Sequence, residues 1–137
     1  MPQSLRVLLY VTDVSFLLYW ALAGLSQLGA IEIPPAWMYA NYDKPDVIAW
    51  NWSFFPLDLA FSYCGLRAIA ASRAGSELWR PYALVSLILT ITAGGMAVGY
   101  WAILREFDPL WFGMNLSLVV WPLFYLRPFF SERPVDA

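Results

Sequence analysis

The sequence predicts an all-α integral membrane protein, folded as a four-helix bundle with both termini in the cytoplasm. Hydrophobic residues make up 61% of the 137 residues and charged residues only 13%, whereas soluble domains carry about 25% charged residues. Four apolar segments are long enough to cross a bilayer, and in lipid such segments must be helical to satisfy their backbone hydrogen bonds. Most of the basic residues flank these segments on one side only. We therefore expect one four-span domain that covers residues 1–137.

The first two spans are expected at residues 7–29 and 47–66. A cleavable signal peptide is the alternative interpretation of the first span, but Asp13 interrupts the apolar core that such a peptide needs. Asp46 precedes the second span and is a suitable N-cap. Pro56 lies inside that span, lacks an amide hydrogen and clashes with the preceding turn, so we expect a kink there.

The third and fourth spans are expected at residues 81–104 and 109–126. Each begins with a proline, Pro81 or Pro109, and proline suits the first turn of a helix because its missing N–H would be unpaired there in any case. Asp108 directly precedes the fourth span and is its expected N-cap.

Arginine placement predicts the orientation of the four spans. Six arginines lie before the first span, between the second and third, or after the fourth: Arg6, Arg67, Arg73, Arg80, Arg127 and Arg133. The two remaining loops hold only Lys44 and Arg105 as basic residues. Because cytoplasmic loops are enriched in basic residues, both termini are expected in the cytoplasm.

The composition disfavours several classes of function. The chain has no histidine, which is the commonest metal ligand and the usual acid or base near neutral pH. Cys64 is the single cysteine, so neither an internal disulfide nor a thiolate metal cluster can form. A net charge of −2 provides no basic face for nucleic acid. We therefore predict no metal, no cofactor and no nucleic-acid partner, and an enzyme is disfavoured.

Two aspartates, Asp13 and Asp58, lie within apolar spans, where a carboxyl group costs about 2.5–3.5 kcal/mol. Counted from opposite sides of the membrane, both fall near mid-depth. If the two helix faces meet, the carboxyls are expected to share a proton, because close carboxylates in a low dielectric do not both ionise. The functional interpretation is a proton-carrying or ligand-orienting pair. The alternative is that each aspartate only ties helices together.

Further polar and aromatic residues accompany these aspartates. Residues 50–58 read Trp-Asn-Trp-Ser-Phe-Phe-Pro-Leu-Asp, and the fourth span carries an asparagine at similar expected depth. Polar groups beside broken helical backbone often line a cavity in membrane proteins. We therefore predict a ligand-binding site formed by Asp13, Asn51, Trp52, Asp58 and Asn115.

Gly95 and Gly99 form a G-x-x-x-G pattern in the third span. Small residues at this spacing let two helix backbones approach closely. These glycines are expected to pack inside the bundle or, alternatively, to form the face of a homodimer or of a contact with a partner membrane protein.

The string at residues 50–58, together with Ile-Pro-Pro at 33–35 and Thr12-Asp13 followed by Tyr19-Trp20, resembles the YvaD-like family of small bacterial membrane proteins. The resemblance implies a four-span inner-membrane protein and no known activity. In architecture alone, the chain also resembles the four-helix sterol-isomerase and emopamil-binding group, which implies a lipid-accepting cavity between acidic residues of the first two spans. The histidine of that group has no counterpart here.

Three functions are compatible with these observations. The first is a binding protein that holds a lipid-like or small amphipathic ligand, such as a membrane lipid, in a cavity among the helices. The second is an accessory subunit of a membrane complex, in which the polar residues only join helices. The third is a small proton-coupled transporter, which would act as an oligomer with Asp58 as the proton carrier.

Overall fold

The computed structural model describes residues 1–34, 37, 39 and 41–130, and over these residues the regular structure is helical. The helices are α1 (Gln3–Gln27), α2 (Pro45–Ser53), α3 (Phe55–Arg73), α4 (Trp79–Leu104) and α5 (Pro109–Phe130). Helices α2 and α3 follow each other so closely that they count as one candidate span, Pro45–Arg73. With α1, α4 and α5 this makes four segments that are long and apolar enough to cross a membrane. The prediction of an all-α chain with four such segments is confirmed.

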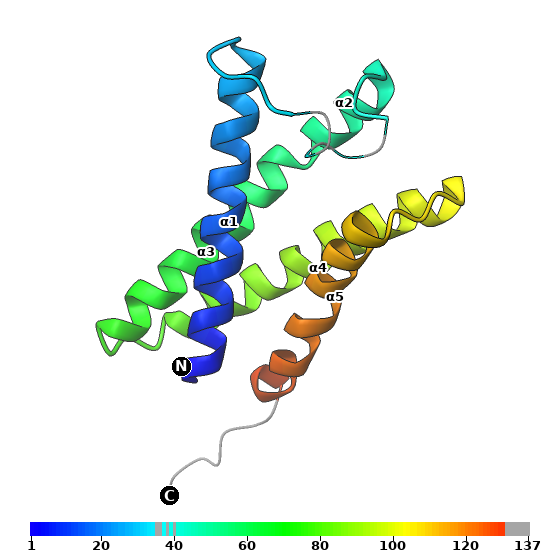
Figure 1. The fold of residues 1–137 in the computed structure, drawn as a ribbon. Coiled ribbons are helices and arrows are strands. Elements are labelled where there is room, and N and C mark those ends of the chain that lie inside the picture. The colour runs from blue at the N-terminus through cyan, green and yellow to red at the C-terminus, as the bar shows by residue number, and fades with distance from the viewer. Residues whose placement is uncertain (35–36, 38, 40, 131–137) are drawn as a thin grey trace, which may run out of the picture.

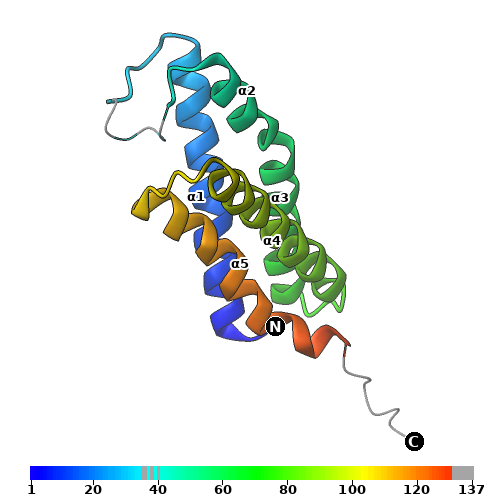
Figure 2. The ribbon, with the colours of Figure 1, turned by 90° about the vertical axis from the view of Figure 1, so that its right-hand side faces the viewer.

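The spans pack in a series, with α1 against α3, α3 against α4 and α4 against α5. Helices α1 and α5 are therefore the two edges of the series, as Figures 1 and 2 show. The N-terminus, the α3–α4 connection and the end of α5 lie at one end of the molecule (Figure 1). Helix α2 and the α4–α5 connection lie toward the other end.

The expected kink at Pro56 is a full interruption of the helix. Helix α2 ends at Ser53, and Phe54 separates it from α3. The Phe54 N–H donates to the Asn51 carbonyl at 3.1 Å in a tight turn, and the Asp58 N–H donates to the Phe54 carbonyl at 2.8 Å to begin the next helix. Proline disrupts the helical hydrogen-bond ladder because it has no amide hydrogen to continue it. The second candidate span therefore consists of two helices with a one-residue break at Phe54.

One of the two expected N-caps is confirmed and the other is wrong. The carboxylate of Asp108 accepts the N–H groups of Leu110 and Trp111, both at 2.9 Å, at the start of α5. At the start of α2, by contrast, the N-cap residue is Lys44, and Asp46 lies inside the first turn. The helix begins two residues earlier than expected because Pro45, with its fixed φ angle, takes the first helical position.

Two clusters of buried apolar side chains hold the helices together. The first centres on Leu9, Ala68 and Leu87 and also draws in Trp121 of α5, so it joins all four spans near the arginine-rich end. The second centres on Trp20, Phe61 and Ala93, with mostly aromatic side chains packed against it. Both clusters include residues from α1, α3 and α4, whereas α5 contributes only to the first. This difference leaves space beside α5 on the side of the second cluster.

Candidate functional site

A cavity of about 390 Å³ lies between the spans beside the second cluster. Its walls come from every helix, and aromatic rings make up much of them. The described residues that line it are Val11, Thr12, Ser15, Phe16, Tyr19, Trp20, Tyr39, Trp50, Asn51, Phe54, Asp58, Ala93, Ala97, Trp101, Trp111, Met114, Asn115, Ser117 and Leu118. Three of the five predicted site residues, Asn51, Asp58 and Asn115, are therefore brought together around one space.

Asp58 is the acidic residue of this cavity. It lies in the first turn of α3, directly after the helix break, and only 3% of its surface is exposed. Its Oδ2 accepts a hydrogen bond from the indole Nε1–H of Trp20 on α1 at 2.9 Å. Its Oδ1 has no hydrogen-bond partner among the described residues. A buried carboxyl oxygen without a partner is costly, so a ligand that supplied one would be stabilised there.

The two asparagines of the cavity are held in different ways. Asn51 accepts the hydroxyl hydrogen of Tyr19 at 3.0 Å, which ties α2 to α1. Asn115 donates from its Nδ2 to the Trp111 carbonyl at 2.8 Å, within its own helix. Both side-chain amides thus keep further hydrogen-bonding capacity, since an amide has two donors and two acceptor lone pairs. The cavity thus has polar groups from α2, α3 and α5, together with Thr12 and Ser15 of α1, in a wall rich in aromatic rings.

Asp13 does not belong to this cavity, and it does not pair with Asp58. Its side chain is fully buried and packs against the backbone of Gly65, which has no Cβ in the way. Asp58 lies seven residues before Gly65 on the same helix, which places it about 10 Å farther along the axis. The expectation that the two carboxyls share a proton is therefore wrong. Both Asp13 oxygens lack hydrogen-bond partners among the described residues.

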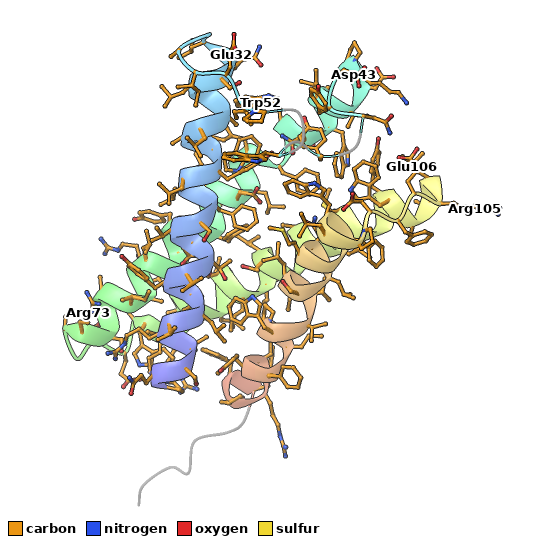
Figure 3. All side chains as sticks on the ribbon, viewed as in Figure 1. Glu32, Asp43, Trp52, Arg73, Arg105 and Glu106 are labelled. Carbon is orange, nitrogen blue, oxygen red and sulfur yellow. The ribbon has the colours of Figure 1, made fainter. Side chains whose placement is uncertain are left out.

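Trp52 lines a second, smaller cavity of about 230 Å³. Figure 3 labels this tryptophan at the end of the molecule that carries α2. The two cavities share four lining residues, Tyr19, Tyr39, Asn51 and Trp111, so the Tyr19–Asn51 hydrogen bond lies on their common border. Burial raises the pKa of the Tyr39 phenol above its ordinary value. The second cavity extends the site toward the acidic end of the molecule.

The expectation that Gly95 and Gly99 pack inside the bundle is wrong. A Cβ atom built on either glycine meets no atom within 4 Å. The neighbouring Gly94 makes the close contact instead, since a Cβ there would lie 2.6 Å from the Asn115 carbonyl oxygen and 2.8 Å from the Leu118 Cβ. Gly94 therefore faces α5, whereas the two glycines of the G-x-x-x-G pattern do not. The alternative role of Gly95 and Gly99 in contact with another chain stays a prediction.

Sequence reasoning did not assign the partner of Asp58 or most of the aromatic wall. Trp20 is seven residues after Asp13 on α1, and this spacing places it on the same helix face as a buried carboxyl. That signal was available in the sequence. Trp50, Trp101 and Trp111 come from three separate helices, so only the folded chain brings them together. Among the described residues, no group of three potential metal ligands gathers.

The charged residues divide between the two ends of the molecule. Figure 3 shows Glu32, Asp43 and Glu106 near one end, with Arg105 beside Glu106, and Arg73 at the other end. At the arginine-rich end, Arg6 donates to the Ser72 hydroxyl at 3.4 Å and Arg80 donates to the Pro128 carbonyl at 3.1 Å. The charge asymmetry expected from the sequence is thus present across the folded molecule.

Comparison with known proteins identifies relatives of this chain but no activity. Residues 5–135 match the model of DUF5360, a family of unknown function. The chain is 38% identical over 130 residues to the uncharacterized protein YvaD of Bacillus subtilis (strain 168). The aligned region covers 95% of this chain and 94% of that protein. No solved structure matches the chain.

Proposed function

This chain belongs to the DUF5360 family, whose function is unknown, and from its own structure we propose that it is an inner-membrane binding protein for a small amphipathic or lipid-like ligand. The observation that supports this proposal is the cavity itself, where polar side chains of α1, α2, α3 and α5 meet in a wall rich in aromatic rings. Small-molecule sites have this character, because apolar walls supply contact area and a few polar groups fix orientation. A volume of about 390 Å³ lies within the range of such sites.

The edges of the cavity support entry of the ligand from the membrane. Val11 on α1 and Met114 on α5 both line it, yet 57% and 52% of their surfaces are exposed. Because α1 and α5 are the two edge helices of the series, the exposed lining lies on the lipid-facing side of the four spans. An amphipathic molecule would pass between these helices with its apolar part still in the membrane.

The charge distribution supports the orientation within the bacterial inner membrane. Arginines gather at the end that holds the N-terminus and the α3–α4 connection, which the positive-inside rule assigns to the cytoplasm. In this orientation the second cavity, with Trp37 and Tyr42 in its wall, lies toward the outer face.

Native mass spectrometry of the purified protein tests the binding function. Wild type is expected to retain a small molecule or lipid that Asp58→Asn loses, because the substitution removes the carboxylate charge and one acceptor from the cavity wall. Circular dichroism of the variant should match wild type, since the amide fills the same space. Bare chains in both samples, under conditions that keep lipid on a control membrane protein, would contradict the proposal.

A second candidate, an accessory subunit, is favoured by the open surface at Gly95 and Gly99. A helix from another chain would approach closely there without meeting a side chain. Under this alternative, Gly95→Leu would release a co-purifying protein and Asp58→Asn would have no effect on it. Under the binding function, Gly95→Leu leaves ligand retention unchanged, so the same two variants separate the candidates.

A further inference from the structure

Resting on the proposed binding function, we propose that the ligand of the main cavity is an organic cation, an amine or quaternary ammonium group joined to an apolar tail. Asp58 supplies the counter-charge, and the tryptophan rings of the wall supply the surface on which the cation lies. The proposed function specifies only an amphipathic ligand. Here its polar end is assigned a positive charge.

The first support is the hydrogen-bonding state of Asp58. Trp20 satisfies only Oδ2, at 2.9 Å, and leaves Oδ1 without a partner among the described residues. Within that part of the chain, no lysine or arginine lines the cavity, so the protein provides no cationic partner for this carboxyl. Buried carboxylates are normally paired, because an isolated buried charge is very unfavourable. A cationic ligand would complete the pair.

The second support is the arrangement of the aromatic wall. Trp50, Trp101 and Trp111 come from α2, α4 and α5 and line the same space as Asp58. Trp50 is held in place by stacking on Tyr100, with ring centroids 4.0 Å apart, and by an edge contact with Trp101 at 5.7 Å. Tryptophan faces attract cations most strongly among the aromatic residues, and aromatic cages are a recurring way to bind quaternary ammonium groups.

The third support is the charge of the neighbouring end of the molecule. The segments at this end carry five acidic residues against Lys44 and Arg105: Glu32, Asp43, Asp46, Glu106 and Asp108. Neither basic residue appears in the wall of either cavity. A surface with charge of one sign raises the local concentration of ligands with charge of the opposite sign. Both the approach and the cavity therefore disfavour phosphate, sulfonate or carboxylate head groups.

A charge series of ligands with one common tail tests the inference. Decyltrimethylammonium, decanol and decanesulfonate would be titrated into the purified full chain in a neutral maltoside detergent, with intrinsic fluorescence and melting temperature as readouts. Wild type is expected to bind the ammonium compound at least about tenfold more tightly than the alcohol, because only the cation gains an ion pair with Asp58 and cation–π contacts with the tryptophan rings. A tenfold preference corresponds to about 1.4 kcal/mol. The sulfonate is expected to bind most weakly.

Two matched variants assign the preference to the cavity. Asp58→Asn should lose the roughly tenfold preference for the ammonium compound while it keeps its affinity for decanol. Asp13→Asn makes the same change at a fully buried aspartate that lines neither cavity, and it should keep the preference. Trp111→Leu should weaken binding of the ammonium compound more than binding of the alcohol. This variant provides a second test if Asp58→Asn does not fold.

The outcomes separate the two proposals. Equal binding of all three compounds by wild type, or tighter binding of the sulfonate, would overturn the cation inference and leave the cavity as a general amphiphile site. Loss of the preference in Asp13→Asn but not in Asp58→Asn would also overturn it. If no compound binds and native mass spectrometry finds no ligand, the proposed binding function itself fails.

Discussion

At the residue scale, two aspartates that look alike in the sequence have different surroundings in the fold. Asp58 bonds Trp20 and lines an aromatic cavity, whereas Asp13 is enclosed by packed helices against Gly65. A carboxyl oxygen that faces a glycine Cα can accept a weak Cα–H hydrogen bond, which is worth about 0.5–1 kcal/mol. The absence of a side chain at position 65 is what allows α1 to lie this close to α3. Asp13 is thus a packing residue in this structure, whereas Asp58 lines the cavity to which we assign the ligand.

Gly65→Ala is expected to destabilise the protein by about 1–3 kcal/mol, the usual cost of overpacking a tight interior. The added methyl group would overlap the Asp13 carboxyl, so α1 would have to move away from α3. The free energy of unfolding in mixed detergent micelles measures the effect. Asp13→Ala combined with Gly65→Ala should recover part of the loss, because it removes the overlapping atoms. Equal stabilities of Gly65→Ala and wild type would show that the contact is not tight.

At the element scale, the break between α2 and α3 and the contact between α4 and α5 shape the cavity. On either side of the break at Phe54, Trp50 and Asn51 of α2 and Asp58 of α3 line the same space. On the opposite wall, Gly94 lets α4 approach the Asn115 backbone closely, which brings α5 into position. A helix pair that packs through glycine gains contact area that a larger residue would prevent.

Gly94→Ala and Gly95→Ala form a matched pair of neighbouring substitutions with opposite expected effects. Gly94→Ala should lower stability by about 1–3 kcal/mol, because its Cβ would lie 2.6 Å from the Asn115 carbonyl oxygen. Gly95→Ala meets no atom within 4 Å and should leave stability unchanged or raise it by up to about 1 kcal/mol through helix propensity. Denaturation of both variants in the same detergent compares them. An equal loss of stability in the two variants would indicate that both glycines pack closely against neighbouring residues.

At the scale of the whole molecule, apolar packing joins the four spans at one end, and the cavities lie toward the other end. The first apolar cluster joins α5 to the other spans near the arginine-rich end, while the main cavity lies beside the second cluster. Acidic residues surround the connections at that second end. The molecule therefore has a packed basic end and a hollow acidic end, which in the proposed orientation face the cytoplasm and the outside.

Cysteine labelling of intact cells tests this orientation. On a Cys64→Ser background, Asp43→Cys should react with a membrane-impermeant maleimide, because residue 43 lies at the acidic end. Ala74→Cys, in the connection between α3 and α4, should react only after the cells are lysed. Both parent residues are exposed, so accessibility within the fold does not separate them. The reverse labelling pattern would invert the orientation, and labelling of both sites in intact cells would contradict a four-span arrangement.

Much of the fold was predictable because membrane insertion leaves clear local signals. Uninterrupted apolar length, flanking charge and proline are properties of short segments, and they predicted the four helical segments, the break near Pro56 and the Asp108 cap. The errors arose where a choice depended on packing. Both Gly94 and Gly95 offer a small surface, and only the rotation of α4 decides which of them meets α5. The expected Asp46 cap was wrong by two positions, since Pro45 already begins α2 and Lys44 is its N-cap.

The sequence by itself determined the all-α class, the four apolar segments, the charge difference between the two ends, and three of the residues that line the cavity. These depend on hydrophobicity and helical periodicity, which act within one segment. The tertiary structure decided which polar groups share a space: it separated Asp13 from Asp58, paired Asp58 with Trp20, and gathered tryptophans from three helices. Such neighbours depend on the register and rotation of one helix against another. Many side-chain contacts set these jointly, so no single segment encodes them.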